Sequence, residues 1–371
     1  MRRKTVKKRI CFFSGDITRS GGTERAASQV ANELAKDGAY EVCFLSLVEQ
    51  KEDTFYKIDP AIRRYRLGDH WIKPGPGYLP LIGKLRKFLK EKKIDIIIDI
   101  DIVLDVLSIP AAKSPGTKVV SWEHFNADYE LSVFYRKWIL RYSVKRSDYV
   151  VVLTKADLAD YGKRLGRQNR IAYIYNPVSK PVETGKWERK NQLLTVGRLV
   201  PEKGMDKLMR VAEAVLTAHP DWQWLLLGEG EQRKELERFI SENSLQNRFI
   251  LMGNVADVNL YLRQASILVS TSEYEGFGMS ILEARNMGVP CVSFAVKTGP
   301  LELIQDGVDG FLVQPFDCDA MTGKINTLIE KPSLRERFAK QALLSMSDFE
   351  PETIIKQWKD LLERLTCTET R

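Results

Sequence analysis

Residues 272–283 place two carboxylates, those of Glu275 and Glu283, eight positions apart around a glycine-rich turn. Gly276 and Gly278 allow the backbone to turn tightly and to approach a ligand closely. Side chains early in a helix lean back toward its N-terminus, so we expect Glu283 to face the same crevice as Glu275. Two such carboxylates can accept hydrogen bonds from vicinal hydroxyls of a polyhydroxylated ligand. The alternative is a surface loop with two solvated glutamates.

A second group of polar residues combines Gly197-Arg198 with Lys203-Gly204. The apolar run before Gly197 predicts a strand, and the pattern after Gly204 predicts a helix. An arginine at a strand end, next to a lysine at a helix N-terminus, suits the binding of a diphosphate. An ordinary basic turn is the alternative.

Two groups in the first half of the chain also follow predicted strands. Gly21-Gly22 precedes a predicted helix, and a glycine turn there suits a phosphate or close approach of a substrate. His124 follows the predicted strand 119–121, and ligands of parallel sheets bind at the carboxyl ends of strands. A histidine satisfied by local packing is the alternative at His124.

The elements that must position these residues alternate along the whole chain. We predict strands at 10–14, 42–48, 94–100, 119–121, 149–153 and 172–175, with helices such as 23–36 and 81–92 between them. After a polar linker at 180–190, a second series follows, with strands at 193–196, 224–227, 249–252, 267–270, 291–294 and 311–313 and helices at 205–218 and 232–241. This alternation predicts an α/β fold with two Rossmann-like, doubly wound parallel-sheet domains and a cleft between them.

Size and composition exclude several classes of protein. A chain of 371 residues is too long for one ordinary core. No apolar run reaches the roughly 18 residues that span a bilayer, and the one after the basic N-terminus is too short for a signal peptide. Five scattered cysteines indicate reduced thiols and a cytoplasmic protein. The motif Asp99-Ile100-Asp101 superficially matches a D-x-D metal site, but it ends an apolar strand and we predict no metal.

Charge is distributed unevenly between the two halves. Residues 1–180 hold 34 Lys and Arg against 21 Asp and Glu, a net charge of +13, whereas residues 181–371 hold 23 against 28, a net charge of −5. Segments 79–93 and 134–146 mix basic residues with apolar ones, as in helices that bind an anionic membrane surface. A helix that packs its apolar face inward is the alternative. Nucleic acid is another anionic candidate, but no recognition motif supports it.

With these motifs the chain resembles the retaining glycosyltransferases of the GT-B fold in the large family four. Residues 275–283 are similar to the family's E-x7-E signature, and residues 197–204 to its G-R-x-x-x-x-K-G segment. Residues 228–230 are similar to its G-x-G turn, and residues 20–26 to its N-terminal glycine loop. The motifs span roughly residues 10 to 310.

The resemblance implies a nucleotide diphosphate sugar as donor substrate, with no metal or other cofactor. It implies catalytic roles for Glu275, His124, Arg198 and Lys203. It implies donor contacts from Gly22, Arg198, Lys203, Asn254, Val255, Glu275, Gly276, Phe277, Gly278 and Glu283. The sugar would lie at Glu275 and the Gly276–Gly278 backbone, the ribose at Glu283 and the base near Asn254. Glu123 stands beside His124 where the family more often has a His-Asp pair, which puts the role of Glu123 in doubt.

We therefore expect an acceptor-side domain at 1–180 and a donor-binding domain at 181–350. By resemblance, the helical segment 351–371 packs back on the first domain. The acceptor would be a saccharide, lipid-linked, at the inner face of a bacterial membrane, used in surface glycan biosynthesis. A UDP-hexose or UDP-N-acetylhexosamine is favoured as donor. A sugar-nucleotide epimerase would need no acceptor, a mannosyltransferase would take GDP-mannose, and a nucleotide-binding module would show no turnover.

Overall fold

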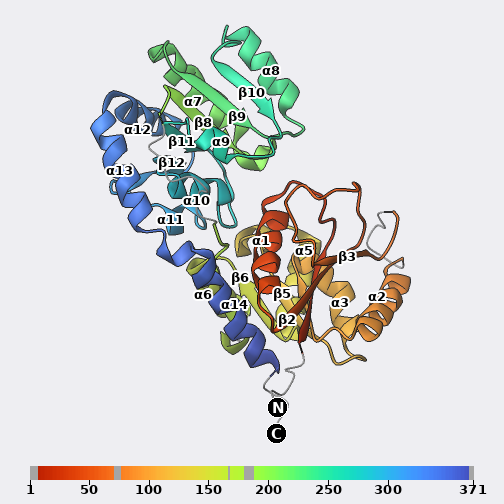
Figure 1. Cartoon of the computed structure of the whole chain (residues 1–371). Helices are drawn as coiled ribbons and strands as arrows, with labels where there is room; N and C mark the ends of the chain where they lie inside the picture. The colour runs from red at the N-terminus through yellow and green to blue at the C-terminus, as the bar shows by residue number, and fades with distance from the viewer. Residues whose placement is uncertain (1–6, 71–76, 166–167, 179–187, 367–371) are drawn as a thin grey trace. The chain divides into compact units, whose positions relative to one another are not determined.

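The computed structural model describes residues 7–70, 77–165, 168–178 and 188–366, and the chain divides into two compact units. Unit 1 comprises Met1–Pro177 with Pro351–Arg371, and unit 2 comprises Val178–Glu350. Each unit is built on one parallel sheet with helices on its faces (Figure 1). The predicted α/β fold with two Rossmann-like domains is confirmed.

The sheet of unit 1 has seven strands in the order β3-β2-β1-β4-β5-β6-β7. Their bounds are β1 Lys8–Ser14, β2 Tyr40–Ser46, β3 Arg63–Arg66, β4 Ile96–Asp99, β5 Lys118–Trp122, β6 Tyr149–Val152 and β7 Ile171–Tyr173. The strand order reverses between β1 and β4, so the loops that follow these two strands diverge there and leave room for a ligand.

The helices of unit 1 connect these strands. They are α1 Gly22–Lys36, α2 Tyr78–Lys92, η1 Ile102–Leu104, α3 Asp105–Ala112, α4 Ala127–Ser132, α5 Phe134–Arg146, α6 Lys155–Leu165, η2 Gln168–Arg170 and α14 Pro351–Thr366. Helix α14 buries Trp358, whose ring lies 4.8 Å from that of Trp122. Its Lys359 Nζ lies 2.6 Å from a carboxylate oxygen of Asp37 after α1. None of the helices in the described ranges is long and apolar enough to cross a membrane.

The sheet of unit 2 has six strands in the order β10-β9-β8-β11-β12-β13. Their bounds are β8 Gln192–Val196, β9 Gln223–Leu227, β10 Phe249–Gly253, β11 Ile267–Ser270, β12 Cys291–Phe294 and β13 Gly310–Val313. The helices are η3 Pro201–Lys203, α7 Met205–Ala218, α8 Arg233–Glu242, α9 Asn259–Leu262, α10 Met279–Asn286, α11 Pro300–Leu303, α12 Cys318–Glu330, α13 Pro332–Leu344 and η4 Ser347–Phe349. Here the order reverses between β8 and β11.

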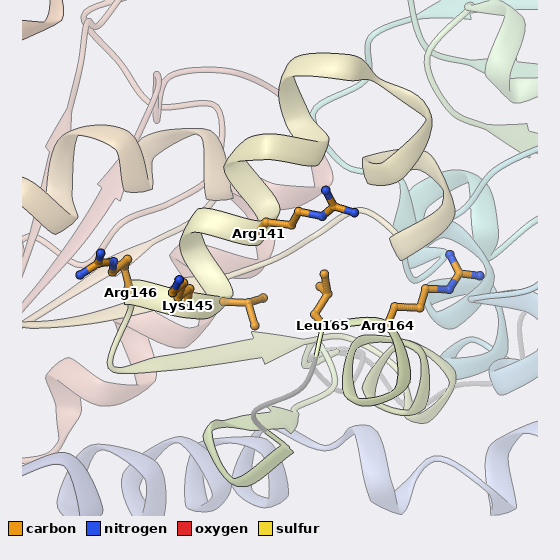
Figure 2. Close-up of a pocket in the computed structure, with 6 residues that line it drawn as sticks. Arg141, Lys145, Arg146, Arg164 and Leu165 are labelled. Atoms are coloured by element: carbon orange, nitrogen blue, oxygen red, sulfur yellow. The ribbon is translucent and has the colours of Figure 1, made fainter.

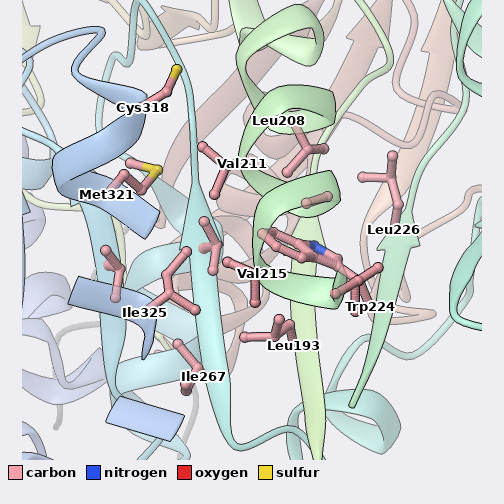
Figure 3. Close-up of a cluster of buried hydrophobic side chains, with 14 of the residues drawn as sticks. Leu193, Leu208, Val211, Val215, Trp224, Leu226, Ile267, Cys318, Met321 and Ile325 are labelled. Carbon is pink, nitrogen blue, oxygen red and sulfur yellow. The ribbon is translucent and has the colours of Figure 1, made fainter. Parts of the chain in front are cut away.

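The core of unit 2 lies between its sheet and a pair of helices. Helices α7 and α12 turn buried residues such as Val211 and Ile325 toward buried strand residues such as Leu193 and Ile267 (Figure 3). Trp224 is fully buried, and its indole N–H donates to Thr195 Oγ1 at 3.0 Å. Burial therefore does not leave this N–H without a hydrogen-bond partner. This packing holds the strand ends that carry the candidate site.

Two expectations from the sequence need correction. Strand β3 was not predicted, because its sequence Arg-Arg-Tyr-Arg lacks the apolar run of a buried strand. Among the described strands it pairs with β2 alone, and charged residues are common on such edge strands. The predicted linker 180–190 falls largely on residues 179–187, which lie outside the described ranges. Its end is wrong, because the Arg189 guanidinium donates to the carbonyl oxygens of Ala265 (3.1 Å) and Met287 (2.5 Å). Burial there lowers the pKa of Arg189 to about 10.

The carboxyl end of β4 carries a buried pair of acids. Asp99 and Asp105 are both fully buried; Ser108 donates a hydrogen bond to Asp99, and Ser121 donates one to Asp105 at 2.5 Å. Burial, reinforced by the neighbouring carboxyl, raises the pKa of Asp99 well above its ordinary value, and burial also raises the pKa of Asp105. The carboxylate of the neighbouring Asp101 lies 3.0 Å from the Arg136 guanidinium.

We predict that Asp99→Asn stabilises the chain, and increasingly so as the pH rises. In the unfolded chain the Asp99 carboxyl loses its proton near about pH 4, whereas in the folded chain it keeps the proton to a higher pH. Its contribution to the free energy of unfolding is therefore complete below about pH 4 and is lost as pH rises through the folded pKa. Denaturant unfolding at pH 5 and pH 8 measures the difference. Asp101→Asn is the matched control and should lose about 1–3 kcal/mol by breaking the ion pair. A loss of stability in Asp99→Asn that grows with pH would contradict a protonated pair.

Candidate functional site

The carboxyl edge of the unit 2 sheet brings most of the predicted donor residues together. All of its strands run parallel, so β10, β9, β8 and β11, which are consecutive neighbours in the sheet, end on the same side. Asn254 follows β10, Gly228 follows β9, Gly197-Arg198 follows β8, and the loop 271–278 follows β11. Because the strand order reverses between β8 and β11, the two central loops flank the place where α/β sheets bind ligands. We call this place the switch edge.

A close backbone contact joins the two central loops. Gly204 has φ +64°, and a Cβ atom built there would lie 2.1 Å from the carbonyl oxygen of Thr271. No L side chain fits that distance, so glycine is required for the approach. The Thr271 hydroxyl donates to the Lys203 carbonyl at 3.0 Å, and the Glu273 N–H donates to the Glu202 carbonyl at 3.0 Å. The start of α7 and the loop after β11 are therefore fixed to each other.

Lys203 and Glu275 meet at this junction. The Lys203 ammonium lies 2.5 Å from Glu275 Oε1, which also accepts a 2.7 Å hydrogen bond from the Ser272 hydroxyl. The Glu275 side chain is 10% exposed and that of Lys203 23%, so the pair lies at the floor of the edge and remains within reach of solvent. The Thr298 hydroxyl donates to the Glu275 carbonyl oxygen and holds the loop from the β12 side.

Arg198 is the contrasting cation of the switch edge. It is exposed after β8, and no described residue forms an ion pair or hydrogen bond with its guanidinium. Its turn packs tightly beneath it, because a Cβ on Gly228 would lie 1.9 Å from the Gly197 carbonyl oxygen. Two positive groups therefore stand at the end of β8: Lys203 is neutralised by Glu275, and Arg198 is available to an anion.

Glu283 and the turn of residues 276–278 lie around the start of α10. Gly278 is the N-terminal capping residue of this helix and has φ +84°, a conformation that glycine adopts without strain. Glu283 lies in the helix and is 3% exposed, so it is far less accessible than the sequence suggests. Phe277 is also buried, and its ring lies 6.2 Å from that of Phe349. Phe277 would therefore contribute to a ligand site through its backbone and not through its ring.

The end of β10 forms the outer part of the switch edge. Asn254 is exposed and Val255 is half-buried. Gly253 has φ +70°, and its carbonyl accepts a 2.8 Å hydrogen bond from the Gly228 N–H, which ties this loop to the turn after β9. Asn254 and the turn at residues 228–230 therefore lie side by side, next to the turn that carries Arg198.

His124 and Glu123 lie after β5 in unit 1. The His124 ring packs 4.6 Å from Trp122 and is 9% exposed; burial lowers its pKa to about 3, so the imidazole is neutral at physiological pH. Its Nε2 has no hydrogen-bond partner among the described residues. Glu123 is almost fully buried and accepts the Phe125 N–H at 2.8 Å, which gives it a role in closing the turn.

Gly22 is the first residue of α1, and a carboxyl group lies beside it. A Cβ on Gly21 would lie 2.2 Å from Glu24 Oε2, so the end of the Glu24 side chain lies against this turn. Glu24 is 7% exposed, and burial raises its pKa. A phosphate at Gly22 would therefore meet a carboxyl group, whereas a neutral hydroxyl would find a hydrogen-bond partner.

Several contacts of the site could not be found from the sequence. The hydroxyls of Ser272 and Thr298 donate hydrogen bonds to Glu275, and the Glu24 carboxyl lies against the turn at Gly21. The sequence showed only that these residues stand near the motifs. Among the described residues, no group of three or more His, Cys, Asp or Glu side chains is arranged to hold a metal ion. The cysteines within the described ranges are free and buried.

Comparisons with known proteins match both units. Residues 20–180 match the family model described as Glycosyltransferase Family 4, and residues 179–344 match that described as Glycosyl transferases group 1. The chain is 29% identical to an uncharacterized glycosyltransferase of Haemophilus influenzae over 96% of this chain and 100% of the relative. It is 26% identical to the amylovoran biosynthesis glycosyltransferase AmsD of Erwinia amylovora, over 95% and 99%.

A third relative carries a more specific name. It is the alpha-1,4-N-acetyl-D-galactosaminyltransferase of Campylobacter jejuni named for GalNAc-alpha-(1->4)-GalNAc-alpha-(1->3)-diNAcBac-PP-undecaprenol. It is 26% identical over 95% of this chain and 98% of the relative.

Two solved structures share the fold. The sucrose-phosphate synthase of Thermosynechococcus elongatus has a TM-score of 0.85 at 20% identity and covers 98% of this chain and 100% of its own. The Anabaena protein HepE, solved in complex with UDP and glucose, has a TM-score of 0.79 at 20% identity over 95% and 99%.

Proposed function

Because the chain is a glycosyltransferase of the GT-B fold, we propose that it transfers a sugar from a nucleotide diphosphate sugar to a saccharide acceptor with retention of anomeric configuration. The observation that carries the proposal is the ion pair of Lys203 and Glu275, which come from the segments after two different strands at the switch edge, near an exposed Arg198. Cations aimed at a leaving diphosphate stabilise the charge that develops on it as the glycosidic bond breaks.

The donor diphosphate is assigned to Arg198 and Lys203. Arg198 can bind phosphate oxygens directly because no described residue occupies its guanidinium. Lys203 is paired with Glu275, so a diphosphate must share the ammonium or displace the carboxylate. Displacement would turn Glu275, still held by Ser272, toward the hydroxyls of the donor sugar.

The remainder of the donor is assigned to the flanking loops. The backbone of residues 276–278 would approach the sugar, Glu283 would accept hydrogen bonds from the ribose hydroxyls, and Asn254 with Val255 would border the base. UDP is favoured because two of the most similar folds, HepE and the TarM protein of Staphylococcus aureus, were solved with UDP. GDP-mannose is the alternative donor.

Unit 1 is assigned the acceptor, with Gly22 and His124 near the reacting groups. A neutral His124 whose buried Nε2 has no partner among the described residues can form a hydrogen bond with a sugar hydroxyl that reaches it, but cannot supply a positive charge. Retention would need no protein base, because the leaving phosphate oxygen can accept the proton of the acceptor hydroxyl on the same face. The acceptor would be a lipid-linked saccharide at the cytoplasmic face of a bacterial membrane. The Campylobacter relative, named for such a compound, supports this class.

The proposal is tested by incubating the protein with UDP- and GDP-sugars and recording proton NMR spectra as the donor is hydrolysed. We expect release of UDP and, from an α-linked donor, first appearance of the α-anomer of the free sugar. First appearance of the β-anomer would contradict retention. Turnover of GDP-mannose alone would contradict the donor, and conversion of one UDP-sugar into another without release of UDP would indicate an epimerase.

The two glutamates should fail in different ways. Glu275→Ala removes a contact to the reacting sugar, so we expect kcat to fall by roughly 10²–10³-fold with a smaller change in the donor KM. Glu283→Ala removes a contact to the ribose, which is bound equally before and during reaction, so we expect the donor KM to rise about 10–100-fold with kcat nearly unchanged. Steady-state kinetics measures both effects. The control is Glu330→Ala, which replaces an exposed glutamate at the end of α12. Equal effects of both variants on kcat and KM would refute the division of roles.

A further inference from the structure

Helix α5 presents its aromatic residues to solvent. Phe134 is 79% exposed, Trp138 59% and Tyr135 55%, and the basic residues Arg141 and Lys145 are exposed on the same side. Residues 134, 138, 141 and 145 follow the three- and four-residue spacing that makes one continuous helical face. The face therefore combines large aromatic rings toward the start of α5 with cations toward its end.

The inward side of α5 explains this orientation and corrects an expectation. The alternative, a helix that packs its apolar face inward, holds for Leu140 and Val144 but not for the aromatic residues, and Arg136, one of the basic residues of the predicted membrane segment, is buried. It lies 3.0 Å from Asp101 and 4.8 Å from the ring of Phe125. Leu140 and Val144 complete the buried side. A rotation of α5 that turned its aromatic residues inward would break the Arg136–Asp101 ion pair and expose Leu140 and Val144. The fold therefore fixes the outward face.

A cationic pocket adjoins this face. It lies between α5 and α6, has a volume of about 640 Å³, and is lined by Arg141, Val144, Lys145, Arg146, Arg164 and Leu165 (Figure 2). No acidic residue is among the described residues that line it. Arg164 also pairs with Asp128 at 2.7 Å, whereas no described acidic residue pairs with Arg141 or Arg146. The Arg141 guanidinium lies 5.9 Å from the ring of Trp138, which links the pocket to the aromatic part of the face.

We propose that the outer face of α5 docks on an anionic phospholipid bilayer, with Phe134 and Trp138 in the headgroup region and the α5–α6 pocket holding a lipid phosphate. Aromatic rings are favoured at the membrane interface because one part of the ring system is apolar and the other tolerates water. Basic residues beside them are attracted to the negative surface potential. The proposal rests on the proposed function in one respect: a lipid-linked acceptor places the substrate at the same surface.

Charge complementarity selects this occupant over others. The α5 face and the pocket carry cations without acidic residues in the lining, within a half-chain of net charge +13. A second copy of the chain would bring the same cationic face against itself, and like charges oppose such a dimer. An acidic protein could match the charge, and it is separated from a membrane in the experiment below.

The test is flotation of the full-length chain with vesicles of phosphatidylcholine alone and with vesicles that also contain phosphatidylglycerol. We expect binding only to the anionic vesicles, weakened by salt. Arg141→Glu with Lys145→Glu should reduce the partition coefficient roughly tenfold or more, and Phe134→Ser should reduce it several-fold. The matched controls are Lys234→Glu with Arg238→Glu, an exposed basic pair of the same spacing on α8, and Leu344→Ser, a residue 76% exposed on α13.

Three outcomes would overturn the proposal: no binding of the wild-type chain to anionic vesicles, an equal loss in the α8 control, or α5-dependent binding to polyglutamate without binding to vesicles. The last would indicate an acidic protein partner. Hydrolysis of the soluble donor by the same samples separates this proposal from the proposed function. Vesicle binding without hydrolysis would contradict the enzymatic proposal and leave the docking surface supported, and hydrolysis without vesicle binding would do the reverse.

Discussion

The contact between Gly204 and the carbonyl of Thr271 is the constraint on which the candidate site depends. Parallel strands place the ends of β8 and β11 on one edge, but only a glycine with positive φ lets the two loops touch. That contact brings Lys203 and Glu275, which are 72 residues apart in sequence, to 2.5 Å. The lysine then has two possible anionic partners, the carboxylate of its own chain and a phosphate of the ligand. Under the proposed function, Lys203 would exchange the Glu275 carboxylate for a donor phosphate.

A second ion pair has a comparable role in unit 1. The Arg136–Asp101 contact fixes the rotation of α5 about its own axis and so determines which side chains meet solvent. The buried Asp99 and Asp105 flank Asp101 in the sequence, and burial raises the pKa of both carboxyl groups. These polar groups at the carboxyl edge of the sheet therefore stabilise the fold. The Arg136–Asp101 pair also holds α5 with its aromatic residues toward solvent.

The sequence predicts the fold well where burial is uniform and fails where a tertiary contact decides. The strands Ile267–Ser270 and Cys291–Phe294 have the predicted bounds, because short apolar runs buried on both faces leave little ambiguity. The burial of Arg136 in α5 was not predicted, because helical patterns assume that charged residues face outward. The motifs located Lys203 and Glu275, but not their pairing or the support from Ser272. The neutral state of His124 follows from its burial, which no local pattern reveals.

Calorimetric titration with UDP most directly tests the claim that Lys203 is exchanged between Glu275 and the donor diphosphate. Glu275→Gln retains the size and hydrogen bonding of the side chain but removes the competing charge, so the account predicts that this variant binds UDP as tightly as the wild-type chain or more tightly. Lys203→Met should weaken UDP binding at least tenfold, the equivalent of about 1.4 kcal/mol. If Glu275→Gln weakens UDP binding as much as Lys203→Met, the pair acts as one fixed unit and the exchange does not occur.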